Sequence, residues 1–172
     1  MRMTYLVPGS FLLVALMLST GCQRGDTIPN LSPLLDEYAK AWNTGEVETL
    51  DAIADSLFVL YMSPHCGPVV GLDTLKAIIL HTRAMYPDFT LRPDEIIFTL
   101  DAAAVRWTAT ATHSGRNAPS LAGKKVHVPG MSLVHFRDGK VVDEWIQTND
   151  RAWMEQLGFE FSPRDSGTVG SK

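Results

Sequence analysis

Side chains able to carry acid–base chemistry gather near the C-terminus, in the stretch GMSLVHFRDGKVVDEWIQTND at residues 130–150. Its apolar alternation is interrupted by Ser132, His135, Asp143, Glu144, Gln147 and Asn149. The dipeptide Asp138-Gly139 predicts a two-residue type I′ turn, because both central residues of that turn take positive φ. The stretch is therefore expected to form a β-hairpin, and its strand pairing decides which polar side chains meet.

A regular register from this turn pairs Phe136 with Val141, Val134 with Asp143, and Ser132 with Trp145. Successive side chains of a strand point to opposite faces. One face then carries Ser132, Val134, Phe136, Val141, Asp143, Trp145, Gln147 and Asn149. The other carries Met131, Leu133, His135, Val142, Glu144, Ile146 and Thr148. We expect the first face to be enclosed, because it holds both large aromatic residues and its polar residues surround Trp145. A bulge at Pro129-Gly130 would invert only the residues before 130.

Asp143 is the candidate acid/base on the expected enclosed face. A carboxylate beside Trp145 would be partly desolvated, which raises its pKa and suits proton transfer. The alternative is a carboxylate at the rim of the sheet. His113, on the apolar face of the preceding strand, could act as a base, polarise a carbonyl or pair with Asp143. Its alternative is a satisfied histidine at a strand end.

Further residues are expected to line or border a pocket without reacting. Ser132 and Gln147 would orient a ligand, together with Tyr61, and Trp107 and Trp145 would form part of the wall. His65, in MSPHCGPVVG, would lie near the pocket mouth. A His65–Cys66 nucleophile pair is disfavoured, because adjacent residues of an extended chain point to opposite sides. The histidines lack the spacing of zinc ligands, so no metal is expected.

The elements that must position these residues follow from the sequence periods. Helical spacing predicts helices over residues 32–44, 46–57 and 71–87, with a strand at 58–64 between the last two. From residue 88 onward the period changes to two. Four strands are expected there, over residues 88–100, 103–115, 124–136 and 140–150, followed by a helix at 151–158. This order indicates an α+β domain with helices on one face of a curved antiparallel sheet.

The N-terminus has the pattern of an export signal. Arg2 precedes an apolar run that is too short to span a bilayer, so residues 1–21 are expected to be a cleaved signal peptide. LSTGC resembles the lipobox of bacterial lipoproteins, which would make Cys22 the lipid-bearing residue on the periplasmic side of a membrane. Gln at the next position resembles outer-membrane sorting. Residues 22–33 would form the linker, 34–160 the domain and 161–172 a flexible tail.

Composition fits one globular domain. The chain has 172 residues, of which 45% are hydrophobic and 20% charged, enough to form a core. Its net charge is −4 and it has no Lys/Arg cluster, so nucleic acid is not an expected partner. It has two cysteines, and a lipid on Cys22 would leave Cys66 without a disulfide partner.

The hairpin and several other stretches resemble a known family. GMSLVHFRDGKVVDEW followed by MEQLGF is similar to the last hairpin and helix of SnoaL-like polyketide (ester) cyclases, in the nuclear transport factor 2-like superfamily. YAKAWNTGEVETLDAI, YPDFTL and TATATHSG fit the same family in order. The resemblance implies a cone, in which a curved antiparallel sheet wraps around three to four helices and encloses a pocket. It also implies intramolecular aldol cyclisation by an acidic residue, without metal or organic cofactor.

The sequence departs from this family at two positions of the penultimate strand. The resemblance implies an acid/base Asp where this chain has Ser132, and an Arg where it has His135. We therefore expect either acid–base turnover of a small, largely apolar carbonyl or ester compound, by cyclisation, isomerisation or hydrolysis, or a binding module without turnover. The outer sheet face, with Met131, Leu133 and Ile146, is a candidate surface for a homodimer.

Overall fold

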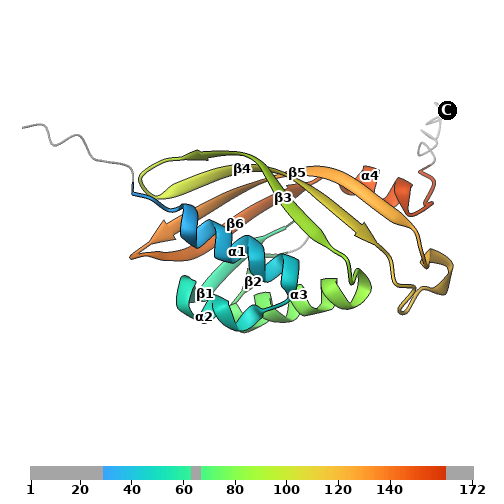
Figure 1. Cartoon of the computed structure of the whole chain (residues 1–172), viewed down its shortest axis with the longest axis horizontal. Coiled ribbons are helices and arrows are strands. Elements are labelled where there is room, and N and C mark those ends of the chain that lie inside the picture. Colours follow the sequence, from blue (N-terminus) through green and yellow to red (C-terminus); the bar gives the residue numbers. More distant parts are fainter. Residues whose placement is uncertain (1–28, 63–66, 162–172) are drawn as a thin grey trace, which may run out of the picture.

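Apart from a two-residue strand at Val69–Val70 that was not predicted, the strands and helices follow one another in the order that the sequence periods predict. The computed structural model describes residues 29–62 and 67–161. Its α-helices are α1 (Ser32–Thr44), α2 (Leu50–Ile53), α3 (Leu72–Met85) and α4 (Asp150–Gln156) (Figure 1). Its strands are β1 (Ala54–Tyr61), β2 (Val69–Val70), β3 (Thr90–Phe98), β4 (Ala102–Thr112), β5 (Lys125–Arg137) and β6 (Lys140–Thr148). Short 3₁₀ turns lie at Val47–Thr49 and Pro119–Leu121.

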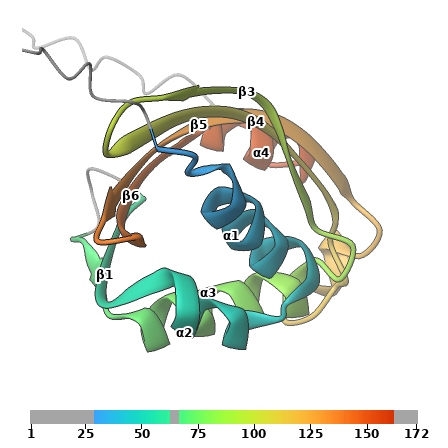
Figure 2. The same ribbon diagram turned by 60° about the vertical axis from the view of Figure 1, so that its left-hand side comes forward.

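The six strands form one curved sheet in the order β2-β1-β6-β5-β4-β3. Figure 2 shows this sheet wrapped around α1. The edge strands β2 and β3 do not pair with each other, so the cone is open rather than a closed barrel. Strands β3 to β6 form the predicted antiparallel meander. β1 instead pairs in parallel with β6, so the sheet is mixed. The α+β cone is confirmed, with one parallel pair that the sequence periods do not indicate.

The second predicted helix is shorter than expected, because the sheet takes its C-terminal half. Helix α2 ends at Ile53 and β1 begins at Ala54, whereas the sequence predicts a helix to residue 57. Phe58 and Leu60 alternate with more exposed neighbours and are both buried. Pairing with β6 and this period-two burial outweigh the helix propensity of the segment.

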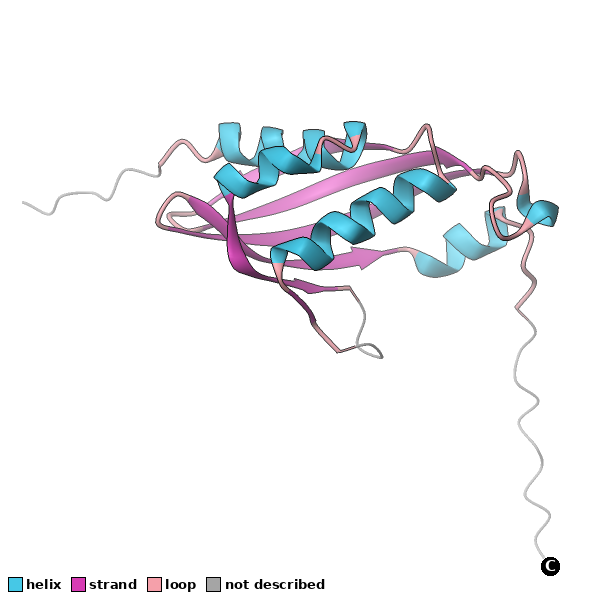
Figure 3. Cartoon of the chain, turned by 90° about the horizontal axis from the view of Figure 1, so that it is seen from below, coloured by secondary structure: helices cyan, strands magenta, loops and turns pink. Residues whose placement is uncertain are grey.

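Helices α1 and α3 cover the concave side of the sheet with amphipathic faces (Figure 3). Pro33 stands in the first turn of α1, where its missing N–H costs no hydrogen bond. The buried residues of α1 are Leu35, Tyr38, Ala41 and Trp42, and those of α3 are Leu72, Leu75 and Ile79. The helix at the end of the chain, α4, is capped by Asn149, whose side chain accepts from the Ala152 N–H at 3.1 Å.

The turn between β5 and β6 is the predicted one, but the register changes soon after it. Asp138 and Gly139 have φ of 51° and 72°, and Phe136 pairs with Val141. A β-bulge follows, because the next pair is His135 with Asp143 and Val142 has no partner of its own. Every later side chain of β6 therefore lies on the face opposite to the predicted one.

We call the concave face of the sheet the inner face and the convex one the outer face. The bulge places Glu144, Ile146 and Thr148 on the inner face and Asp143, Trp145 and Gln147 on the outer face. The predicted faces of these six residues are wrong, and Asn149 is the cap of α4 rather than part of the face. Residues of β5 and β4 do alternate as predicted: Ser132, Val134 and Phe136 are buried, and so are Val105, Trp107, Ala109 and Ala111.

Candidate functional site

A cavity of about 480 Å³ lies between the inner face of the sheet and helices α1, α3 and α4. This volume is within the range of small-molecule pockets. Its wall is mostly apolar and aromatic. The residues with hydroxyl or carboxyl groups that border it are Tyr38, Thr82, Tyr86, Ser132, Glu144, Thr148 and Asp150. Among the described residues of this wall there is no Lys, Arg or His, so no cation balances its two acids.

Glu144 is the acid inside the cavity. Its side chain comes from the middle of β6, is 5% exposed, and accepts a hydrogen bond from the Tyr38 hydroxyl of α1 at 2.6 Å. Burial raises the pKa of Glu144 above its ordinary 4.5, while hydrogen bonds from Ser132 and Tyr38 act in the opposite direction. A carboxyl group with these properties can hold or release a proton in a largely apolar cavity.

Tyr38 is the hydrogen-bond donor to Glu144, and its hydroxyl stays protonated. Burial, followed by the negative charge of Glu144, raises the pKa of Tyr38 well above its ordinary 10.0, and a hydrogen bond involving Trp42 opposes this. The hydroxyl therefore keeps its proton at neutral pH and directs it to the Glu144 carboxyl. Its helix packs across the concave sheet, and a tilted contact with Phe58, at 6.1 Å between ring centroids, holds the ring in place.

Ser132 and Trp107 form the second polar contact of the cavity wall. Trp107, on β4, donates its indole Nε1–H to the Ser132 hydroxyl on β5 at 2.9 Å. Both side chains are buried and both line the cavity. The predicted ligand-facing positions of Ser132 and Trp107 therefore agree with the geometry, and the two residues lie together with Glu144.

His113 is buried behind the cavity wall rather than in it. Its side chain is 1% exposed, its Nδ1 accepts from the Gly115 N–H at 2.9 Å, and Nε2 has no partner among the described residues. The imidazole meets Tyr86 edge-on, at 5.0 Å between ring centroids, and Tyr86 in turn lines the cavity. His113 does not pair with Asp143, which was one of the roles that the sequence left open.

Asp143 and three predicted ligand-binding residues lie on the outer face. Asp143 Oδ1 is 2.6 Å from Nδ1 of His135. Trp145 is 49% exposed and stacks on Tyr61, with ring centroids 4.0 Å apart, and Gln147 is exposed. These four side chains do not line the cavity, because the bulge at Val142 turned Asp143, Trp145 and Gln147 outward and the parallel pairing placed Tyr61 beside Trp145.

Two predicted positions, His65 and the lipid-anchor residue Cys22, lie outside the described residues. Within the described ranges, no three side chains of the kinds that bind metals come together. Of the apolar residues expected on a dimer surface, Met131 and Leu133 are exposed on the outer face, whereas Ile146 faces the cavity.

Sequence reasoning missed Glu144 and Tyr38, which are the centre of the polar cluster. Tyr38 belongs to the apolar stripe of α1, and nothing in that stripe singles out its hydroxyl. An unbroken alternation from the turn places Glu144 on the outer face. A bulge leaves no residue signature in VVDE, so only the pairing of β6 with both of its neighbours reveals that Glu144 points inward.

Known proteins resemble this chain in both sequence and structure. IdmH of Streptomyces antibioticus superposes with a TM-score of 0.65 at 23% identity, covering 76% of this chain and 100% of that chain. AclR of Streptomyces galilaeus has a TM-score of 0.65 at 25% identity, covering 80% and 91%. A SnoaL-like polyketide cyclase from Agrobacterium tumefaciens has a TM-score of 0.62 at 18% identity, covering 76% and 99%. No match was found among curated proteins.

These solved structures share the cone fold of the nuclear transport factor 2-like superfamily. In sequence, the family model described as SnoaL-like polyketide cyclase matches residues 33–157, which is most of the chain and includes every element that lines the cavity. The chain therefore belongs to the SnoaL-like polyketide cyclase family.

Proposed function

We propose that this chain binds a small, uncharged, largely apolar carbonyl or ester compound and moves protons on it with Glu144. Family membership supports a ligand-binding function of the cyclase or isomerase type. One observation carries the finer proposal: the Glu144 carboxyl is buried in the wall of an apolar cavity, with the Tyr38 hydroxyl 2.6 Å away and no cation in the described wall.

Ionised Glu144 would act first as a base. It would take a proton from the carbon next to the ligand carbonyl, and the electron pair of that C–H bond would move onto the carbonyl oxygen as an enolate. A raised pKa makes the carboxylate a stronger base, because the proton it gains is held more tightly. Tyr38, which stays protonated, is the donor that can turn toward the developing negative charge.

Protonated Glu144 would then complete the reaction as an acid. Returning the proton to another carbon of the enolate gives an isomerisation. In a cyclisation, the enolate carbon attacks a second carbonyl of the same molecule, a C–C bond forms, and the new alkoxide takes the proton from Glu144. Both routes leave Glu144 ionised again and need no other reactant, so this one acid/base carboxyl in a largely apolar cavity is sufficient for them.

A binding module without turnover is the second candidate. It is favoured by Ser132, which stands where the resemblance to the cyclases implies an acid/base Asp. A serine has no carboxyl group to move protons, so the family reaction would lack one of its groups. In this case the Glu144–Tyr38 pair would orient a ligand carbonyl or hydroxyl by hydrogen bonding alone.

The experiment begins with identification of the ligand. Residues 23–172 are purified under mild conditions, any small molecule bound to the protein is identified by native mass spectrometry, and its turnover is measured. The proposal predicts conversion of that compound, a loss of about 100-fold or more in Glu144→Gln, and a smaller loss in Tyr38→Phe. A bound compound that wild-type protein leaves unchanged supports the binding module instead.

We also propose that the protein is exported and carries lipid on Cys22, on the basis of the signal-like residues 1–21 and the LSTGC motif. No helix among the described residues is long and apolar enough to cross a membrane. Expression of the full chain in a Gram-negative host should yield an N-terminal peptide that starts at Cys22 with acyl chains, measured by mass spectrometry. Cys22→Ala should release the protein from the membrane fraction, and a mature N-terminus at any other residue would contradict the proposal.

A further inference from the structure

The Ser132 hydroxyl accepts a hydrogen bond from Trp107, whose indole N–H can only donate. The Trp107 indole offers only an N–H, so the 2.9 Å contact with Ser132 Oγ uses the oxygen of serine as the acceptor. The one proton of the Ser132 hydroxyl is then free to be donated elsewhere. Both side chains are buried, with Ser132 only 6% exposed, so water has little access to that proton.

Glu144 is the acceptor that the Ser132 proton can reach. On the inner face, Val134 pairs with Glu144 and Ser132 with Ile146, so Ser132 and Glu144 are diagonal neighbours on adjacent strands. Hydrogen bonding from Ser132 lowers the pKa of Glu144, against the effect of burial. Asp150 is the other ionisable acid of the cavity wall, and it is exposed at the start of α4.

Gly130, the partner of Trp107 on β5, leaves the space that the Trp107 indole occupies. A Cβ atom at residue 130 would lie 2.1 Å from Trp107 Cη2 and 2.4 Å from Cζ2, far inside van der Waals contact. The φ of Gly130 is not in the left-handed region, so space rather than backbone conformation requires glycine here. The indole can lie flat across the strand only because this residue has no side chain.

We propose that Gly130 and Trp107 form a positioning device that directs the Ser132 hydroxyl onto Glu144 and so keeps this carboxyl available as a base. Ser132, where the resemblance implies an acid, serves here as a fixed donor to an acid on the neighbouring strand. The proposal gives Ser132 and Trp107 a role through Glu144, without contact with reacting atoms. Its catalytic meaning rests on the proposed function, but the Trp107–Ser132 hydrogen bond and the diagonal placement of Ser132 and Glu144 are present without any ligand.

The test is a titration of the Glu144 carboxyl carbon by NMR in protein labelled with ¹³C at glutamate, with the signal assigned by its absence in Glu144→Gln. Ser132→Ala should raise the pKa of Glu144 by about one unit, since a hydrogen bond to the charged form is lost. Trp107→Phe keeps the ring but removes the N–H, and should raise the pKa in the same direction. Ser132→Thr, which keeps a hydroxyl, should stay close to wild type.

A double variant and a matched tryptophan make the test specific. Ser132→Ala combined with Trp107→Phe should shift the pKa no further than Ser132→Ala alone, because Trp107 acts only through Ser132. Trp153 also lines the cavity but donates its N–H to Tyr86 at 3.2 Å, so Trp153→Phe should leave the pKa of Glu144 unchanged.

Two results would overturn the positioning device: an unchanged pKa of Glu144 in Ser132→Ala, or equal effects of Trp107→Phe and Trp153→Phe. The proposed function fails separately. If the titration shifts as expected but no compound is turned over, the device stands and the acid–base proposal falls. If turnover depends on Glu144 but the pKa of Glu144 does not shift in Ser132→Ala, the acid–base proposal stands and the positioning device falls.

Discussion

At the scale of single residues, Glu144 is a buried carboxyl group with no cation beside it among the described residues. Among the described residues, Glu144 has the neutral Tyr38 hydroxyl as a hydrogen-bond donor and no ion-pair partner, and burial is the largest cause of its raised pKa. The charged form of such a carboxyl group is stabilised less than that of an ion-paired carboxylate. Buried carboxyl groups of this kind are typical of functional sites rather than of residues that stabilise the fold. Asp143, one residue away, has the more ordinary arrangement, close to His135 on the outer face.

This burial predicts a pH-dependent cost of folding. Below about pH 4.5 Glu144 is protonated in both states, and as the pH rises the unfolded chain releases its proton first. Stability of the wild type is therefore lost between the ordinary pKa and the raised pKa of the folded state. The loss amounts to about 1.4 kcal/mol for each pH unit that separates these two pKa values. Glu144→Gln should gain stability relative to wild type across that window and keep the gain above it.

Urea unfolding of both proteins from pH 4 to pH 9 measures this difference, and titrations shared by the two proteins cancel. A difference in the free energy of unfolding that is the same at every pH would show that Glu144 has an ordinary pKa in the folded protein.

At the scale of elements, the position of one extra residue in β6 decides which side chains of that strand face the cavity. The Asp138-Gly139 turn could be predicted from sequence, because its positive φ values demand these residue types. The alternation of β4 and β5 was equally predictable. The bulge at Val142 was not, since it depends on contacts from two sides: β5 on one edge of β6 and β1 on the other. Because of this one extra residue, Glu144 rather than Asp143 faces the cavity.

The packing of Trp107 over Gly130 predicts a selective cost for an added methyl group. Gly130→Ala should lower the free energy of unfolding by about 1–3 kcal/mol, because the new Cβ overlaps the indole. Gly67 has no described atom within 4 Å of an added Cβ and no positive φ, so Gly67→Ala should change it by less than about 0.5 kcal/mol. Thermal and urea unfolding check this pair, and equal stability of the two variants would mean that Trp107 can move away freely.

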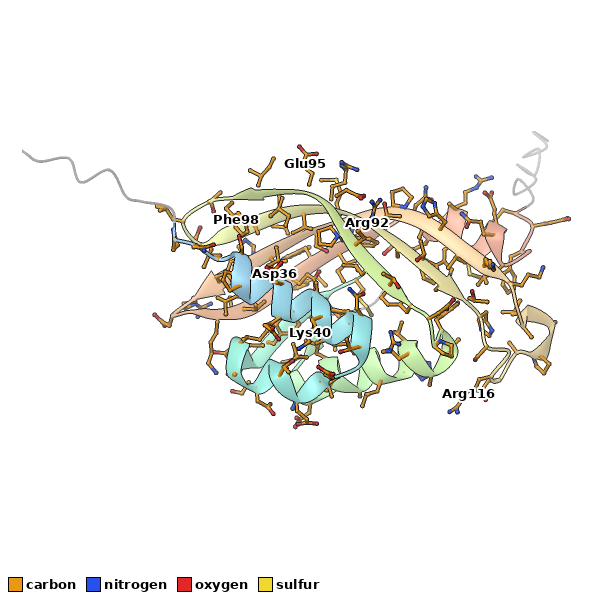
Figure 4. The ribbon with its side chains drawn as sticks, in the orientation of Figure 1. Asp36, Lys40, Arg92, Glu95, Phe98 and Arg116 are labelled. Atoms are coloured by element: carbon orange, nitrogen blue, oxygen red, sulfur yellow. The ribbon has the colours of Figure 1, made fainter. Side chains whose placement is uncertain are left out.

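At the scale of the whole molecule, the fold was predictable and the site only in part. Resemblance over nearly the whole domain indicated the cone, and the helices and strands confirm it. Chemistry inside a cone depends on which few side chains point inward, and a single register shift decides that. Figure 4 labels five charged side chains that are exposed on the outside: Asp36, Lys40, Arg92, Glu95 and Arg116.

This distribution of charge predicts selectivity for uncharged ligands. The described wall of the cavity contains two acids and no basic residue, so a carboxylate would be desolvated there without a partner. Once a ligand with a carbonyl or ester group is identified, the corresponding free carboxylate should bind about tenfold or more weakly at pH 8, measured by calorimetry. The amide, matched in size and uncharged, should stay close to the original affinity. Equal binding of ester and carboxylate would contradict this view of the cavity.

The most direct test of the central claim compares the two neighbouring carboxyl groups of β6. The value of kcat/KM for the identified compound is measured in wild type, Glu144→Gln and Asp143→Asn. The account predicts a loss of about 100-fold or more in Glu144→Gln, and a value within about twofold of wild type in Asp143→Asn, whose side chain lies outside the cavity. Full activity in Glu144→Gln, or a comparable loss in Asp143→Asn, would contradict it.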